Sequence, residues 1–197
     1  GRELELDAVS EVPRYYVCNA YGVCGIYSAP GTAVKEAYDT SGIVTNDRGV
    51  TVWLKGNRVS RNQIMAIKEE SVTEQKNSLA VCLDNILRHA GITRNTEYDL
   101  AQGKTATTIL SENMTGVQVL DLSGCTLDAV LYYVNQDIPV LAILDDGEAV
   151  LVTGFNEFNV VIMEPSTGKL YKKGMNDATA WFAENGNHFI TYMRTEN

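Results

Sequence analysis

Residues 77–92 read NSLAVCLDNILRHAGI, and this apolar stretch is the one around which the fold is organised. Its apolar side chains recur every three or four residues, the spacing that gives an α-helix one broad buried face. They are Leu79, Val81, Cys82, Leu83, Ile86 and Leu87. The Ser78 hydroxyl is suited to cap the first turn, and Gly91 is suited to end the helix. The stretch therefore predicts a central, mostly buried helix.

The N-terminus of this helix is the first place to look for chemistry. Its unpaired amides and the positive end of the helix dipole favour an activated nucleophile. Ser78 and Cys82, which lies one turn further along, are the two candidates. We interpret Ser78 first as the N-cap. Cys82 has apolar neighbours, which favours a buried, unreactive thiol, because a reactive cysteine needs exposure and positive surroundings.

The composition is that of a globular protein that can bury a core, with 197 residues, 45% hydrophobic and 21% charged. A formal net charge of -9 and the lack of any basic run argue against a nucleic-acid or anionic-membrane binder, since these partners require clustered Lys and Arg. The longest apolar run, residues 138–144, is too short to span a bilayer. No signal-peptide pattern lies at residues 1–7, and a signal removed during processing is left open.

The four cysteines and two histidines are too few and too unevenly spaced for a disulfide scaffold or a zinc site. We therefore expect no metal and no other cofactor. Cys18 and Cys24 are the exception, because residues 19–23 read as a hairpin loop with Gly22 in the left-handed conformation. In that register Cys18 lies opposite Cys24, at a separation that a disulfide can bridge. A disulfide and a pair of small apolar strand residues both remain open.

The sequence pattern divides the chain into three parts. Residues 1–13 read as a polar tail or linker that ends at a proline. Residues 14–60 predict a small α+β unit in the order strand, strand, helix, strand, strand, which is marginal alone on surface-to-volume grounds. Residues 61–197 predict helices first and then a mainly antiparallel sheet, the segregated order of an α+β fold.

The individual elements follow from apolar residues at helical or strand spacing. In the small unit we expect strands 15–18, 23–27, 43–45 and 50–54, and helix 32–38. In the larger part we expect, besides the central helix, helices 61–68, 96–102, 105–113, 127–135 and 175–184. The strands expected there are 117–120, 138–144, 148–155, 160–163, 169–172 and 188–193.

This order, a capped helix followed by an antiparallel sheet, resembles the papain-like cysteine peptidases. The central helix resembles the nucleophile helix of the bacteriocin-processing, double-glycine-leader peptidases (cysteine peptidase family thirty-nine) and their "like" domains. That helix reads Cys-Gly-Pro-Ala-Ala and then Leu-x-Tyr-x-Gly. Aligning residues 87–91, LRHAG, on the end of this pattern places Ser78 on the nucleophilic Cys.

Three downstream stretches extend the resemblance to about residues 62–194. Residues 138–142, IPVLA, resemble the strand before the catalytic His. Residues 148–156, EAVLVTGFN, resemble the family's His-Ala-Val-Val-Val-x-Gly-Tyr-Asp, which places Glu148 on that His. Residues 160–168, VVIMEPSTG, resemble the strand that ends in Asp-Pro-x-x-Gly, which places Glu164 on the third catalytic residue.

At each position that aligns with a catalytic residue of the family, this chain has a different residue. Papain-type catalysis needs a thiolate held by an imidazolium. Here Ser78 replaces the Cys, and a carboxylate such as Glu148, with an ordinary pKa of about 4.3, is a poor base for an alcohol. Glu164 beside it would add repulsion and would not orient an imidazole. The family's oxyanion-hole Gln aligns with Val72, although Gln75 is close to it in sequence.

The two histidines lie outside these motifs. His89 is near the C-terminal end of the central helix, too far along to serve a group at its start. His188 begins the last strand, where we expect a surface or edge residue. The sequence therefore offers no proton shuttle.

We expect a catalytically inactive peptidase-like domain that binds a peptide or protein partner through Ser78, Gln75, Glu148 and Glu164. The alternative is an active cysteine or serine hydrolase with a rearranged site that uses Cys82 or Ser78. A third interpretation is a purely structural module of a larger surface protein. The family's "like" domains are often exported or membrane-associated bacterial proteins, so the resemblance implies a location outside a bacterium or on its surface.

Overall fold

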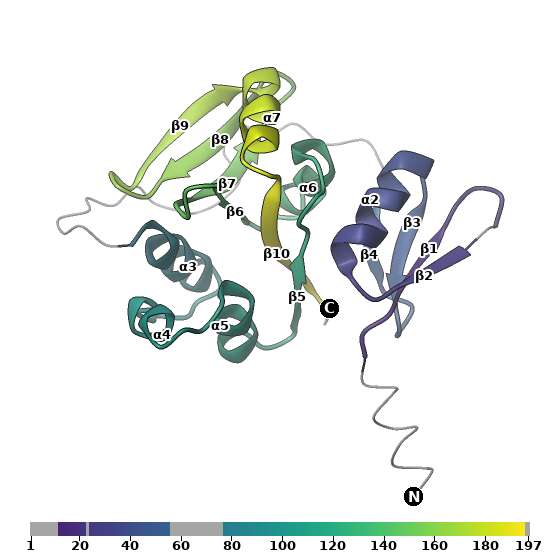
Figure 1. Ribbon diagram of the computed structural model, residues 1–197, viewed down its shortest axis with the longest axis horizontal. Coiled ribbons are helices and arrows are strands. Elements are labelled where there is room, and N and C mark those ends of the chain that lie inside the picture. Colours follow the sequence, from purple (N-terminus) through teal and green to yellow (C-terminus); the bar gives the residue numbers. More distant parts are fainter. Residues whose placement is uncertain (1–11, 23, 56–76, 196–197) are drawn as a thin grey trace, which may run out of the picture. The chain divides into compact units, whose positions relative to one another are not determined.

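The computed structural model describes residues 12–22, 24–55 and 77–195. The chain divides into two compact units, Gly1–Gly56 and Asn57–Asn197, which are described separately below (Figure 1). The boundary predicted at residue 60, the predicted helix 61–68 and most of the predicted tail lie outside the described residues.

The first unit is a four-stranded antiparallel sheet with one helix packed on it. Its strands follow the order β2-β1-β3-β4, and α2 contacts all four of them. The elements are β1 (Tyr15–Cys18), β2 (Cys24–Tyr27), α2 (Pro30–Thr40), β3 (Ile43–Asn46) and β4 (Thr51–Leu54). The predicted strand, strand, helix, strand, strand order is confirmed. The helix begins earlier than expected because Pro30, whose φ is already helical, occupies its first turn.

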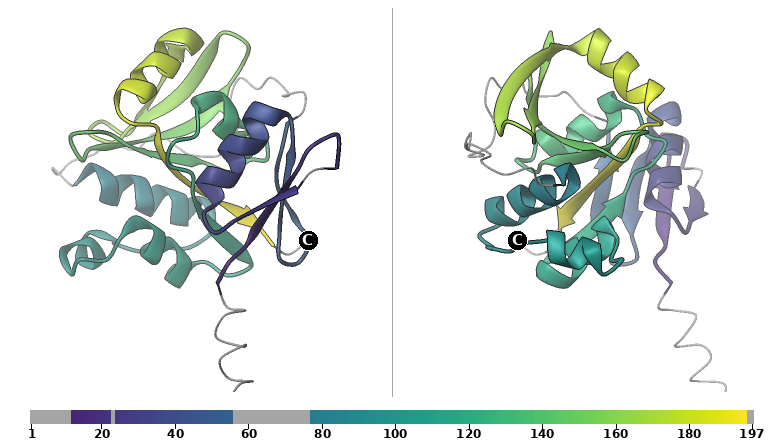
Figure 2. Two further views of the ribbon diagram at one scale, coloured as in Figure 1. Left: turned by 45° about the vertical axis from the view of Figure 1, so that its right-hand side comes forward. Right: turned by 60° about the vertical axis from the view of Figure 1, so that its left-hand side comes forward.

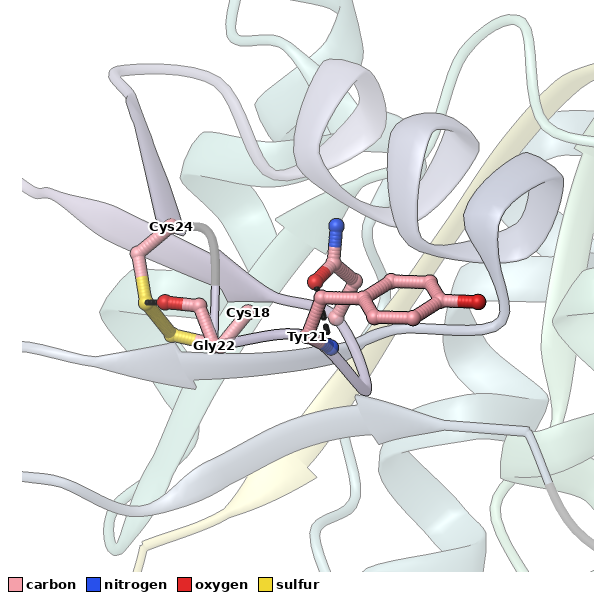
Figure 3. The surroundings of a disulfide bond; sticks show 5 residues. Cys18, Tyr21, Gly22 and Cys24 are labelled. Atoms are coloured by element: carbon pink, nitrogen blue, oxygen red, sulfur yellow. Dashed lines mark hydrogen bonds between the residues drawn. A yellow bond between two sulfur atoms is a disulfide. The ribbon is translucent and has the colours of Figure 1, made fainter.

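A disulfide closes the hairpin between β1 and β2. Cys18 and Cys24 are register partners, and their sulfur atoms are bonded (Figure 3). The loop between them is fixed by Asn19, whose side-chain oxygen accepts from the Tyr21 amide at 2.9 Å and whose carbonyl accepts from the Gly22 amide at 3.0 Å. Gly22 has a φ of 78°, as the loop requires. The Tyr21 side chain is 92% exposed.

Replacing Cys18 and Cys24 together by Ser should destabilise the first unit by about 2 kcal/mol, because the reduced unfolded chain regains the entropy that this short covalent loop removes. Buried Trp53 reports on this unit, so urea unfolding is followed by its fluorescence in a Trp181→Phe background. Wild-type protein with a reductant should behave like the double variant. Equal midpoints for oxidised and reduced protein would contradict the expectation.

The second unit is built on a six-stranded sheet in the order β5-β10-β6-β7-β8-β9, with every neighbouring pair antiparallel. Its helices are α3 (Ser78–His89), α4 (Glu97–Ala101), α5 (Ala106–Asn113), α6 (Leu127–Val134) and α7 (Met175–Glu184). Its strands are β5 (Val117–Asp121), β6 (Val140–Ile143), β7 (Ala149–Phe155), β8 (Asn159–Glu164), β9 (Lys169–Gly174) and β10 (His188–Arg194). Among the described residues, no helix is long and apolar enough to cross a membrane.

Strand β7 is the centre of this unit. All of its residues are buried, and both α3 and α6 pack against it (Figures 1 and 2). Because successive side chains of a strand face opposite sides, this burial means that both faces of β7 are covered. Thr153 is the one residue of β7 with a side-chain hydroxyl. This hydroxyl lies 3.4 Å from the carbonyl oxygen of Val161 and donates to it. The strand before it, β6, starts later than predicted because Pro139 cannot donate to the ladder.

Helix α3 has the predicted apolar face but a different N-cap. Asn77 caps it, since its side-chain oxygen accepts from the amides of Leu79 at 2.9 Å and Ala80 at 3.4 Å. The interpretation of Ser78 as the cap is therefore wrong, because Asn and Ser cap equally well and Asn77 comes first. The predicted end at Gly91 is confirmed, with a φ of 85°.

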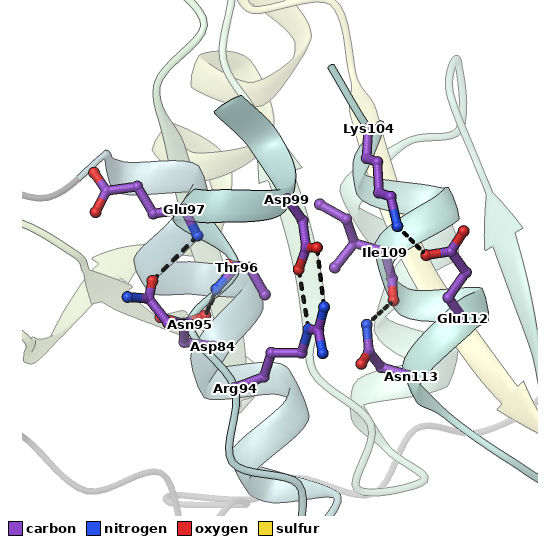
Figure 4. A network of polar contacts seen from close by, with 10 residues as sticks. All are labelled: Asp84, Arg94, Asn95, Thr96, Glu97, Asp99, Lys104, Ile109, Glu112 and Asn113. Carbon is purple, nitrogen blue, oxygen red and sulfur yellow. Dashed lines mark hydrogen bonds and ion pairs between the residues drawn. The ribbon is translucent and has the colours of Figure 1, made fainter. Parts of the chain in front are cut away.

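A polar network holds the segment after α3 in place (Figure 4). Asp84 on α3 accepts from both the amide and the hydroxyl of Thr96, at 2.8 and 2.7 Å. Arg94 donates to both carboxylate oxygens of Asp99, each at 3.0 Å, and Asp99 is only 3% exposed. The hydrogen bonds from Arg94 hold the pKa of Asp99 below its ordinary value. The network therefore joins α4 to α3.

Replacing Arg94 by Gln should leave Asp99 as a buried, unpaired carboxylate. Because the folded-state pKa of Asp99 is lowered, its pairing stabilises the fold above the ordinary pKa of an Asp, and this contribution is lost as the pH falls through the lowered value. We expect R94Q to lower the thermal unfolding midpoint most at neutral pH, and the difference from wild type to shrink below about pH 4. R94K keeps the charge but not the two-bond geometry, so its thermal unfolding midpoint should lie between those of R94Q and wild type. A difference independent of pH would argue against the network.

Candidate functional site

The start of α3 is joined to the start of β7 by one hydrogen bond. Ser78 Oγ accepts from the backbone amide of Ala149 at 2.9 Å, across 71 residues of sequence. The Leu144 amide donates to the Glu148 carbonyl, so the next amide, that of Ala149, faces away from β6 and toward β8. The β7–β8 register places Ala149 beyond Glu164, the last residue of β8. The hydroxyl of Ser78 thus takes the place of a strand partner.

Glu148 lies directly before this amide, in the turn between β6 and β7. Its side chain is exposed, and its own amide donates to a carboxylate oxygen of Asp146 at 2.9 Å. Gly147, with a φ of 85°, allows the turn. The position that aligns with the family's His is therefore next to the residue that Ser78 holds.

Glu164 ends β8 and folds its carboxylate onto its own turn. Its carboxylate oxygens accept from the amide of Ser166 at 3.1 Å, from the hydroxyl of Ser166, and from the hydroxyl of Thr167 at 3.3 Å. Burial raises the pKa of Glu164, but these hydrogen bonds outweigh burial and hold the pKa below its ordinary value. Glu164 is therefore ionised at neutral pH, with its oxygens already engaged.

Cys82 is fully buried on α3. Burial raises the pKa of its thiol well above the ordinary value, and the negative charge of Glu164 raises it further. The thiolate is thus disfavoured, which is the opposite of what a nucleophilic cysteine needs. The predicted buried thiol is confirmed.

Neither histidine of the chain lies near Ser78. His89 is the last residue of the 12-residue helix α3, about 16 Å along the axis from Ser78, with Nε2 3.2 Å from the carbonyl oxygen of Asp137. His188 pairs with Ile143, which pairs with Ala149, so it lies two strands, about 10 Å, from Ala149 on the side away from β8. The expectation of an edge residue was wrong for His188, because β10 lies inside the sheet and the residue is half-buried.

The structure thus gathers three of the four predicted site residues, Ser78, Glu148 and Glu164, at one end of the sheet. Gln75 lies outside the described residues. Within the described ranges, no three His, Cys, Asp or Glu side chains are grouped so that they could hold a metal ion. Sequence reasoning missed Asn185, whose side-chain oxygen accepts from the Asp145 amide at 3.0 Å. Nothing local in the sequence indicates a contact across 40 residues.

A helix docked by its N-terminus at the start of a central antiparallel strand defines a papain-like α+β fold, and a solved structure bears this out. The chain is similar to the crystal structure of a protein from Bacillus anthracis that is provisionally described as a C39-like peptidase. The TM-score is 0.56 at 12% sequence identity, over 70% of this chain and 100% of that one. No family model matches the sequence, and neither does any curated protein. At this identity the likeness shows the fold, and the predicted fold class is confirmed.

Replacing Ser78 by Ala should leave the part-buried amide of Ala149 without its acceptor, at a cost of about 1–3 kcal/mol. Hydrogen exchange should accelerate at Ala149, while the first turn of α3 stays protected. Replacing Asn77 by Ala is the matched control. It removes the cap, at a cost of about 1 kcal/mol, and should speed exchange at Leu79 and Ala80. Faster exchange at Leu79 and Ala80 in the Ser78 variant, with exchange at Ala149 unchanged, would instead identify Ser78 as the N-cap.

Proposed function

We propose that the second unit is a catalytically inactive papain-like domain that binds a peptide or protein segment beside the start of α3. The observation that supports this most directly is the environment of Ser78. Its Oγ already accepts the Ala149 amide, and the positions that align with the family's His and Asp carry Glu148 and Glu164. The scaffold of a peptidase site is kept while its chemistry is absent.

Among the described residues, no carboxylate or imidazole makes a hydrogen bond to Ser78 Oγ, and this is the physical basis of the proposed inactivity. A serine attacks a carbonyl only when a base within about 2.6–3.2 Å removes its proton. Glu164 is held by its own turn, and both histidines are too distant. Cys82 has no exposed surface and a raised pKa, so it does not replace the missing thiolate.

The binding role rests on the fold and on charge. The start of α3 is joined to the start of β7, and the turn before β7 carries the exposed carboxylates Asp145, Asp146 and Glu148. A formal net charge of -9 favours a neutral or basic segment over an acidic one. The disulfide between Cys18 and Cys24 supports a location outside a bacterium or on its surface, because disulfides persist in oxidising compartments.

The chemistry is tested with iodoacetamide and a synthetic peptide that ends in a double glycine. The native protein should leave Cys82 and Cys125, both buried, unlabelled and the peptide uncut, whereas denaturant should expose both thiols. Labelling of native Cys82, with a measured hydrolysis that disappears in Cys82→Ala, would instead establish an active hydrolase.

Binding is tested with fluorescence-labelled peptides of basic, neutral and acidic composition. Glu148→Arg should weaken binding of the basic peptide, and Glu97→Arg, an equally exposed charge reversal on α4, should not. No binding by any of the three peptides would favour a purely structural module.

A further inference from the structure

The turn between β6 and β7 is tied to the end of α7 by a single side chain. The amide group of Asn185, the C-cap residue of α7, uses both of its ends. Its Oδ1 accepts from the Asp145 amide at 3.0 Å, and its Nδ2 donates to the Trp181 carbonyl at 2.9 Å. Only an amide supplies an acceptor and a donor in this geometry.

The same turn carries the start of β7. Asp146 follows Asp145 and accepts from the Glu148 amide at 2.9 Å, and the next amide, that of Ala149, donates to Ser78. Hydrogen bonds of neighbouring residues therefore link α7 to the turn, and the turn to α3. Releasing the Asn185 end removes the hydrogen bond that ties α7 to the turn on which Glu148 is placed.

Asn185 is followed by Gly186, and this is the one Asn-Gly pair in the sequence. An asparagine before glycine is the most easily deamidated, because glycine has no side chain to obstruct attack by its own backbone nitrogen. The Gly186 nitrogen bonds to Cγ of Asn185, the Cγ–Nδ2 bond breaks and ammonia leaves, which gives a succinimide. Water then opens the ring at either carbonyl, which yields aspartate or isoaspartate.

We propose that Asn185 is a modification site, where deamidation releases the β6–β7 turn from α7. Aspartate places an acceptor oxygen against the Trp181 carbonyl where Nδ2 donated, next to the carboxylates of Asp145 and Asp146. Isoaspartate also lengthens the backbone at the helix cap. Either product removes the two-ended contact.

The folded structure slows the deamidation of Asn185. The Gly186 amide donates to the Ala183 carbonyl at 3.0 Å, and both ends of the Asn185 amide are engaged. Cyclisation requires this corner to open, so the modification accumulates at the rate at which the end of α7 opens. The proposal holds whether or not the adjacent site binds a peptide.

The whole protein is incubated folded and in denaturant at mildly alkaline pH, and each asparagine is followed by peptide mapping that separates aspartate from isoaspartate. Asn185 should be the fastest site in the unfolded chain and markedly slower in the folded one. Folded molecules modified there should lose protection from hydrogen exchange at Asp145 and Ala149 by about tenfold, the equivalent of one net hydrogen bond.

Asn185→Asp should reproduce that loss, whereas Asn176→Asp should not. The control adds the same charge at an exposed position in the first turn of α7. If Asn185→Asp fails to fold, the time course on the wild-type protein decides the question. Unchanged protection at Asp145 and Ala149 after modification, or an Asn185 no faster than the other asparagines in the unfolded chain, would overturn the proposal.

Discussion

Strand β7 is covered on both faces, yet its first amide lies where the neighbouring strand has already ended. A buried amide without a partner is costly, so an acceptor must come from elsewhere, and α3 brings one at Ser78. The need for this acceptor fixes the position of the start of α3 along β7. The same end of the sheet carries the proposed site, since Glu148 and Glu164 flank this amide.

In the inactive domain that we propose, the residues at the start of α3 and the end of β8 hold the fold together. In an active enzyme the first turn of this helix must keep a nucleophile free to react. Here the corresponding hydroxyl serves the structure, while Glu164 is held by the hydroxyls and amide of its own turn. Both side chains are therefore engaged in hydrogen bonds within the fold, as the proposed inactivity requires.

The sequence was sufficient for the order of the elements, because β7 reads as an apolar run broken by Thr153 and α3 as an apolar face of helical spacing. It was insufficient where two residues suit one role, as with the caps Asn77 and Ser78. It also failed for His188, because a strand at the end of a chain gives no sign of its place inside a sheet. The contacts of Ser78 with Ala149 and of Asn185 with Asp145 join residues 71 and 40 positions apart, and no local pattern encodes such pairs.

The closed hairpin of the first unit has a consequence for the order in which that unit comes apart. The covalent link keeps the end of β1 beside the start of β2 in every conformation of the oxidised chain. Strand β4 is the opposite edge of the same sheet; it pairs with β3 and packs against α2, with no covalent link to another strand. Opening should therefore begin at β4 and end at β1 and β2, which makes the disulfide-closed pair a permanent nucleus from which the unit refolds.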